Sequence, residues 1–99
     1  MNYPKVIKST PVTMVNFIVD WCPHCQRMLS TFDRVRDDMI ADVNTFVINC
    51  EQHPDVADMA EVEVYPTSIV YKDGEEVWRG TGEATVDDLE NQLKKALGK

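Results

Sequence analysis

Two cysteines separated by two residues, Cys22 and Cys25, are the groups in this chain best suited to covalent chemistry. They stand where an apolar run gives way to a helical pattern, which predicts that Cys22 lies at a helix N-terminus. The unpaired backbone N–H groups and the positive end of the helix dipole stabilise a thiolate there. Because the thiolate is the form that attacks disulfides, the placement predicts a nucleophilic thiol with a second thiol one turn further on.

Thiol–disulfide exchange is the reaction that this pair predicts. Cys22 would attack a substrate disulfide and form a mixed disulfide, and Cys25 would then displace the substrate. The redox-active Cys22–Cys25 disulfide would be the protein's own cofactor, and we expect neither another cofactor nor a metal. Two alternatives stay open: a zinc or iron–sulfur site shared between two chains, and a protein-interaction module in which the cysteines are incidental.

His24 lies between the two cysteines and is a candidate for tuning them. An imidazole beside a thiolate donates a hydrogen bond or, when charged, attracts the anion, and either effect lowers the thiol pKa. Stabilising the thiolate stabilises the dithiol form, so the disulfide form becomes the better oxidant. We therefore predict a relatively oxidising couple; the alternative is an exposed His24 with no effect.

The segments on either side of the pair have to position it. Residues 12–19 form a near-continuous apolar run typical of a strand that is buried on both faces. From Pro23 to Val43, apolar residues recur at three- and four-residue steps, which predicts an amphipathic helix with Pro23 in its first turn.

Further patterns complete the expected order of elements. They are a short edge strand at Val6-Ile7, a buried strand at Thr45–Cys50, a short helix from Pro54 to Ala60, a strand at Thr67–Tyr71, a turn at Lys72–Glu75, a strand at Glu76–Arg79 and a helix capped by Thr85. Gly80 and Gly82 are expected to break the chain after the last strand. The order predicts an α/β fold, with a mixed central sheet flanked by helices, in a single domain over residues 1–99.

Composition narrows the classes of function. The chain has 99 residues and a net charge of −7, with scattered lysines and arginines, so we expect one domain and no nucleic-acid partner. No apolar run approaches the ~20 residues of a membrane-spanning helix, and no apolar signal segment follows Met1. We therefore expect a cytoplasmic monomer that has no membrane partner. In a reducing compartment a close cysteine pair is catalytic or metal-binding more often than structural.

The chain resembles the thioredoxin family over nearly its whole length, with the first strand and helix shortened. The resemblance rests on the segments Val15-Asn16-Phe17, Trp21-Cys22 through Cys25, Asn49 through Pro54, Tyr65-Pro66-Thr67 and Lys72-Asp73-Gly74, and on Gly82. It implies a thioredoxin-like fold and a thiol–disulfide oxidoreductase that acts on protein or small-molecule disulfides. It also implies recycling by a thioredoxin reductase or glutathione.

The resemblance further assigns residues to the site. Pro66 is the expected cis-proline beside the dithiol, where proline brings no N–H and no reactive group. The backbone of the preceding Tyr65 can pair with an extended peptide. Trp21, Pro23, Tyr65 and Gly82 are the expected substrate-binding residues around the cysteines.

Several positions depart from the family's pattern. Asn16 stands in place of a buried aspartate thought to assist proton transfer, so it is a candidate proton-transfer position that cannot ionise. Val47 replaces a nearby lysine, and Ser30 replaces the proline that kinks the active-site helix, which predicts a straighter helix. The family's Gly-Pro between the cysteines is Pro-His here, as in periplasmic disulfide-bond oxidases.

The direction of the reaction therefore stays open. A cytosolic reductase with a relatively oxidising couple is the leading prediction, and a disulfide oxidase or isomerase is the alternative. The third cysteine, Cys50, is expected to be a buried small apolar residue, with a regulatory thiol as the less favoured interpretation.

Overall fold

A mixed four-stranded sheet in the order β2–β1–β3–β4 forms the centre of the computed structural model, which describes residues 2–98. Its strands are β1 (Val12–Ile18), β2 (Val43–Asn49), β3 (Thr67–Lys72) and β4 (Glu75–Thr81). β1 pairs parallel to β2 and antiparallel to β3, and β3 and β4 form an antiparallel hairpin. The predicted mixed sheet is confirmed.

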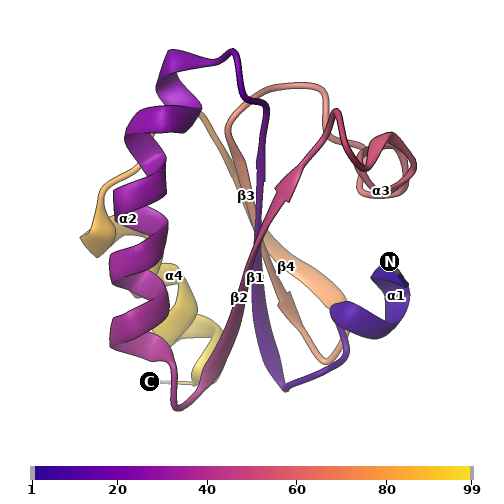
Figure 1. Cartoon of the computed structure of the whole chain (residues 1–99). Coiled ribbons are helices and arrows are strands. Elements are labelled where there is room, and N and C mark those ends of the chain that lie inside the picture. Colours follow the sequence, from indigo (N-terminus) through magenta and orange to yellow (C-terminus); the bar gives the residue numbers. More distant parts are fainter. Residues whose placement is uncertain (1, 99) are drawn as a thin grey trace.

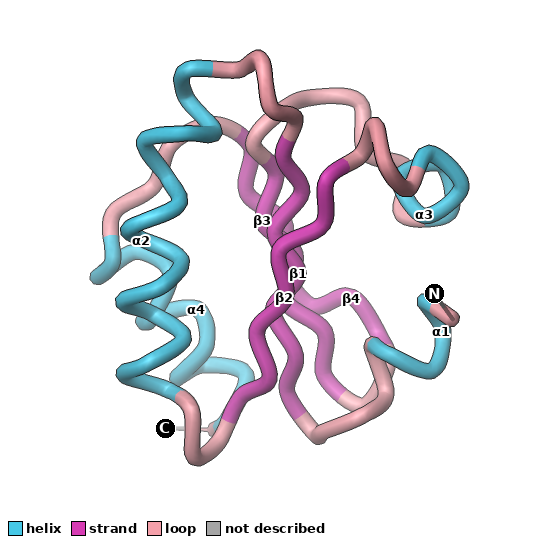
Figure 2. The backbone as a smooth tube through the Cα atoms, in the orientation of Figure 1, coloured by secondary structure: helices cyan, strands magenta, loops and turns pink. Residues whose placement is uncertain are grey.

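Helices cover both faces of the sheet. α2 (Pro23–Met39) and α4 (Val86–Leu97) lie on one face, and α1 (Tyr3–Val6) and α3 (Pro54–Met59) lie on the other (Figure 1). The backbone tube shows the same arrangement, with the sheet lying between these two groups of helices (Figure 2). The predicted helix starts are confirmed, with Pro23 in the first turn of α2 and a capping box between Thr85 and Asp88 at the start of α4.

β1 is the strand from which the site is built, and all seven of its residues are buried. Strands flank it on both sides and helices cover both of its faces, which explains its near-continuous apolar sequence. The ring of Phe17 lies 6.0 Å from the ring of Tyr3 in α1. Because side chains alternate along a strand, Asn16 points to the opposite face, toward α2 and α4.

Two sequence predictions near the N-terminus and at the end of α2 are wrong. Val6-Ile7 is not an edge strand, because Asn2 caps a helical turn there by accepting the Lys5 N–H at 3.2 Å. The Tyr3 hydroxyl lies 2.7 Å from the hydroxyl of Tyr71 and ties this short helix to the sheet. Val43 does not belong to α2, since the helix ends at Met39 and Val43 starts β2.

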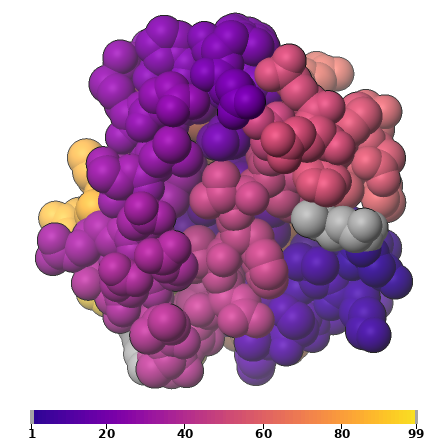
Figure 3. All heavy atoms as spheres, viewed as in Figure 1, coloured from indigo at the N-terminus to yellow at the C-terminus, as the bar shows by residue number. Residues whose placement is uncertain are grey.

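β2 is a strand, as predicted, but it is not buried on both faces. It stands at the edge of the sheet with β1 as its only strand neighbour among residues 2–98, and the side chain of Val47 is 44% exposed. In the space-filling view, β2 reaches the surface between α2 on one side and α1 and α3 on the other (Figure 3). A pattern of apolar residues does not report whether a strand has one neighbour or two.

Gly80 does not break the chain, because β4 continues through it to Thr81. A Cβ at this position would lie 2.4 Å from the indole ring of Trp78. Glycine therefore lets the indole lie over the strand, and its role here is a close approach instead of a turn.

Candidate functional site

Three chain segments that are far apart in sequence meet at one edge of the sheet. β1 and β4 run in one direction and β3 runs in the other, so the end of β1, the start of β3 and the end of β4 lie together. The Cys22 thiol lies 3.9 Å from the carbonyl oxygen of Tyr65, and the Gly82 N–H donates to the carbonyl of Pro66 at 2.8 Å. The topology thus brings Cys22, Tyr65, Pro66 and Gly82 to one place.

The two loops that face Cys22 have specific backbone conformations. The Tyr65–Pro66 peptide bond is cis. Gly82 has φ +82, the left-handed region that glycine adopts without strain, whereas a Cβ there would meet nothing within 4 Å. Backbone conformation, and not lack of space, therefore favours glycine at position 82.

The cysteine pair lies at the predicted helix start. Cys22 is the N-cap of α2, with extended backbone, and Cys25 follows in the first turn. The two residues lie 3.2 Å apart, and both carry free thiols. Cys22 is 6% exposed and Cys25 is fully buried, so a substrate sulfur has access to Cys22 first.

The surroundings shift the two thiol pKa values in opposite directions. The backbone N–H of Cys25 lowers the pKa of Cys22 most, with smaller contributions from the Cys25 thiol, the His24 N–H and the charge of Arg27, while burial opposes them. Burial raises the pKa of Cys25 to about 11. Cys22 is thus the thiol that ionises first.

The His24 imidazole is directed away from the cysteine pair. Its Nδ1 lies 2.8 Å from Oε2 of Glu83 and 2.8 Å from Nη2 of Arg27. Across the part of the chain that the structure describes, the ring makes no hydrogen bond to Cys22, so the expected imidazole–thiolate hydrogen bond is not formed. His24 acts on the Cys22 sulfur through its backbone N–H.

Arg27 and Glu83 form an ion pair that the sequence analysis missed. Arg27 Nε lies 3.0 Å from Glu83 Oε1, and Arg27 Nη2 lies 3.1 Å from Oε2. Hydrogen bonds from Arg27 and then from His24 lower the pKa of Glu83 to about 2. The three-residue step from His24 to Arg27 places both on one side of α2, which was a usable signal. Nothing in the sequence pairs them with Glu83.

Asn16 is fully buried on the α2 face of β1. Its Nδ2 donates to the carbonyl of Phe46 in β2 at 3.3 Å, and its Oδ1 has no hydrogen-bond partner. Across residues 2–98 the Asn16 side chain makes no hydrogen bond to Cys25. The side chain links β1 to β2 and leaves one buried acceptor unpaired.

The remaining predicted site residues are at the surface around Cys22. The indole of Trp21 is 69% exposed, Pro23 is exposed at the start of α2, and Tyr65 and Gly82 are half-buried in the facing loops. Cys50 is buried, as expected, and burial raises its thiol pKa.

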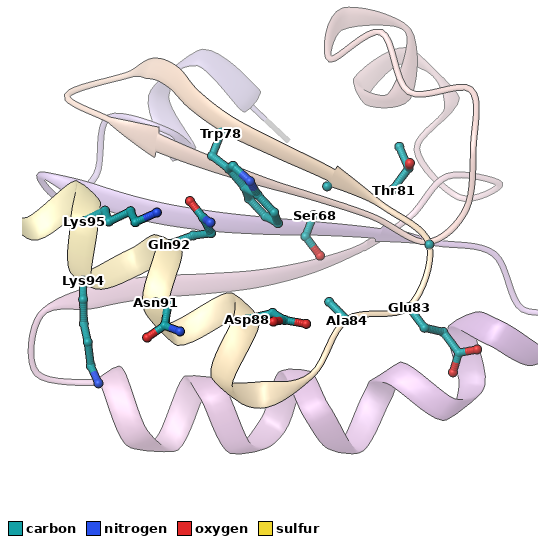
Figure 4. A pocket seen from close by; sticks show the side chains of 12 residues that line it. Ser68, Trp78, Thr81, Glu83, Ala84, Asp88, Asn91, Gln92, Lys94 and Lys95 are labelled. Atoms are coloured by element: carbon teal, nitrogen blue, oxygen red, sulfur yellow. The ribbon is translucent and has the colours of Figure 1, made fainter.

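A groove of about 580 Å³ starts beside Gly82 and runs between β4 and α4. Trp78, Ser68 and Gln92 are among the side chains that line it (Figure 4). Glu83 stands at its end with the carboxylate turned toward α2 and away from the groove (Figure 4).

The described part of the chain holds neither a metal-binding cluster of side chains nor a membrane-spanning helix. No group of three or more His, Cys, Asp or Glu side chains among residues 2–98 is placed to hold a metal ion. In the same residues, no helix is both long and apolar enough to span a membrane.

Several known proteins are similar to this chain in sequence. Thioredoxin Y1 of Arabidopsis thaliana chloroplasts is 27% identical over 92 residues, which is 93% of this chain and 54% of that protein. Bloodstream-specific protein 2 of Trypanosoma brucei brucei is 26% identical over 97 residues, 98% of this chain and 20% of that protein. A protein disulfide-isomerase of Gallus gallus is 28% identical over 87 residues, 88% of this chain and 17% of that protein. The chain spans between about a fifth and about half the length of these relatives.

Solved structures share the fold. Mitochondrial thioredoxin 3 of Saccharomyces cerevisiae, in its oxidised form, has a TM-score of 0.84 and 26% identity, over 94% of this chain and 86% of that one. A mutant thioredoxin of Halobacterium salinarum NRC-1 has a TM-score of 0.86 and 22% identity, over 94% of this chain and 80% of that one. The family model described as Thioredoxin matches residues 1–95. With the fold and the Cys22–Cys25 site in agreement, this chain belongs to the thioredoxin family.

Proposed function

We propose that this protein is a thiol–disulfide oxidoreductase that exchanges a Cys22–Cys25 dithiol or disulfide with protein or small-molecule disulfides. The observation that carries the proposal is the difference between two neighbouring thiols. Backbone N–H groups lower the pKa of Cys22, whereas burial raises the pKa of Cys25 to about 11. This difference suits Cys22 to attack the substrate as a thiolate, while Cys25 stays protonated until the second step.

Reduction of a substrate would proceed in two steps. The Cys22 thiolate attacks one sulfur of the substrate disulfide, forms a mixed disulfide and releases the other sulfur as a thiolate that takes up a proton. Cys25 then loses its proton and attacks the sulfur of Cys22, which forms the Cys22–Cys25 disulfide and releases the second substrate thiolate. Two electrons pass from the pair to the substrate, and the reverse sequence oxidises a dithiol.

The second step depends on removing a proton from a buried thiol. An aspartate at position 16 could accept that proton, but the amide of Asn16 cannot. We therefore propose that resolution of the mixed disulfide is slow near neutral pH, and that the proton leaves to solvent or to the departing substrate thiolate.

Substrate would dock on the surface formed by Trp21, Pro23, Tyr65 and Gly82 around Cys22. The exposed indole of Trp21 supplies apolar contact area. The backbone of Tyr65 lies beside the Cys22 thiol, where an extended peptide could pair with it.

Within this reaction class we propose a cytoplasmic reductase that uses no cofactor besides its own dithiol. A thioredoxin reductase or glutathione would recycle it, and its couple would be relatively oxidising for a reductase. The relatives that are named thioredoxins support the reductase role. An oxidase or isomerase is the second candidate, favoured by the Pro-His dipeptide and by the relative named as a protein disulfide-isomerase.

Trapping the mixed disulfide tests the proposed function. Cys25→Ser should accumulate an adduct between Cys22 and a glutathione or model-peptide disulfide, because nothing displaces the substrate. Cys22→Ser should form no such adduct, and Cys50→Ser serves as a matched control that behaves like the wild type. Exchange at the wild-type rate by Cys22→Ser would refute the proposal, and partner binding retained without both cysteines would support an interaction module instead.

A further inference from the structure

Glu83 connects the loop after β4 to the first turns of α2. Its carboxylate binds Arg27 through two hydrogen bonds of 3.0 and 3.1 Å and lies 2.8 Å from His24 Nδ1. The carboxylate is turned toward α2 (Figure 4). Glu83 is the second residue after Thr81, where β4 ends, and it follows Gly82, whose N–H is fixed on the Pro66 carbonyl, so the position of its backbone is determined by the site itself.

Both partners of Glu83 can carry positive charge, and both follow Cys22 closely in the chain. The charge of Arg27 already lowers the pKa of Cys22, although the guanidinium is directed to Glu83. His24 lies two residues from Cys22, yet its imidazole makes no contact with that sulfur. A thiolate on Cys22 therefore competes with Glu83 for the same two groups.

The Nδ1 atom of His24 holds the imidazole ring beside Glu83 and Arg27. Nδ1 lies 2.8 Å from both Glu83 Oε2 and Arg27 Nη2. A ring nitrogen donates to a carboxylate when protonated or accepts from a guanidinium when not, but it does not do both. In each protonation state one of the two neighbours can hold Nδ1, so the ring stays beside Glu83 and Arg27.

We propose that Glu83 is a positioning residue that limits the oxidising strength of the Cys22–Cys25 couple, because it holds Arg27 and His24 away from the Cys22 thiolate. Weaker stabilisation of the thiolate means weaker stabilisation of the dithiol form, so the disulfide is a milder oxidant than the Pro-His dipeptide alone predicts. The inference rests on the proposed function and adds the residue that moderates it.

The variant Glu83→Gln tests this role, since it removes the charge and keeps the shape of the side chain. The pKa of Cys22 should fall, and the equilibrium with glutathione should shift about threefold toward the dithiol form, the size expected for an exposed charge interaction. A threefold shift corresponds to about 14 mV for a two-electron couple. The pKa is measured from the pH dependence of Cys22 alkylation by iodoacetamide in the reduced full chain.

Glu76→Gln is a matched control. Glu76 forms the same type of two-point pair with Arg79, at 3.0 and 2.7 Å, near the start of β4 and thus at the opposite end of the sheet from Cys22. This variant should change neither the Cys22 pKa nor the glutathione equilibrium. Thermal unfolding of both variants shows whether either loses structure.

A double variant tests the route of the effect. Arg27→Gln alone should raise the pKa of Cys22, because the charge of Arg27 lowers it in the wild type. If Glu83 acts through Arg27, adding Glu83→Gln to Arg27→Gln should change that pKa less than Glu83→Gln changes it in the wild type.

An unchanged or higher Cys22 pKa in Glu83→Gln would overturn the inference, as would an equal shift in Glu76→Gln. The failure of the proposed function looks different, because the wild type would then not exchange with glutathione at all. Alkylation of Cys22 needs no turnover, so the pKa comparison decides the role of Glu83 in either case.

Discussion

The variant Asn16→Asp is expected to make the stability of this protein depend strongly on pH. Position 16 is fully buried, its one hydrogen bond runs to the Phe46 carbonyl at 3.3 Å, and Oδ1 has no partner. A protonated carboxyl can still donate to that carbonyl, but an ionised carboxylate would face an oxygen. Burial without a cationic partner raises a carboxyl pKa by up to about 3–5 units.

The sign and size of the effect follow from proton linkage. The folded state of the variant binds its proton more tightly than the unfolded state, whose aspartate has a pKa of about 3.9. Relative to wild type, the variant should therefore be most stable below the unfolded pKa of about 3.9. As the pH rises from that value to the folded pKa, its free energy of unfolding should fall by about 1.4 kcal/mol per pH unit. A shift of three units gives a loss of about 4 kcal/mol.

Urea unfolding of the variant and the wild type at several pH values between 4 and 8.5 measures this difference. Asn91→Asp, the same change at an exposed position on α4, should show no comparable slope. The reasoning is refuted if the free-energy difference between Asn16→Asp and wild type is the same at every pH. Single-turnover kinetics add a second test, because a carboxylate that accepts the Cys25 proton should speed resolution of the mixed disulfide at least about tenfold.

Three further outcomes are expected. Alkylation of Cys22 should reach half its maximal rate at a lower pH than alkylation of Cys50. Local hydrogen bonds lower the pKa of Cys22, whereas burial raises the pKa of Cys50. The same midpoint for both thiols would contradict this. Gly82→Ala and Gly98→Ala should each lower the free energy of unfolding by about 1 kcal/mol, since both glycines have φ +82. Of these two variants, only Gly82→Ala should slow disulfide exchange. Gly80→Ala should destabilise by about 1–3 kcal/mol, because its Cβ would lie 2.4 Å from an indole ring, and unchanged unfolding would show that the ring moves aside.

Local sequence patterns determined most of the elements around the site. The apolar run of residues 12–19 predicted β1, and the helical spacing after Pro23 predicted α2 with a cysteine at its start. These predictions succeeded because strand burial, helix periodicity and first-turn proline all act over a few neighbouring residues. The place of Pro66 and Gly82 beside the cysteines came from the family resemblance, because no local pattern reports which loops meet.

Local pattern failed where an element's neighbours decide its state. Val6 and Ile7 have strand-forming side chains, but the Asn2 cap and the contact between Tyr3 and Tyr71 favour a helical turn. The sequence of β2 predicted a buried strand, yet β2 lies at the edge of the sheet. Whether a further strand pairs with its outer side depends on the rest of the chain and not on its own sequence.

The sequence by itself determined the reactive pair and the position of Cys22 at a helix start, since both depend on residues within one turn of each other. The tertiary structure alone decided the electrostatic surroundings of that pair. Glu83 is 59 residues from His24 in the chain, and only the packing of the loop after β4 against α2 brings its carboxylate to the imidazole and to Arg27. Charge interactions act through space, so the groups that set the strength of this couple cannot be found from spacing along the chain.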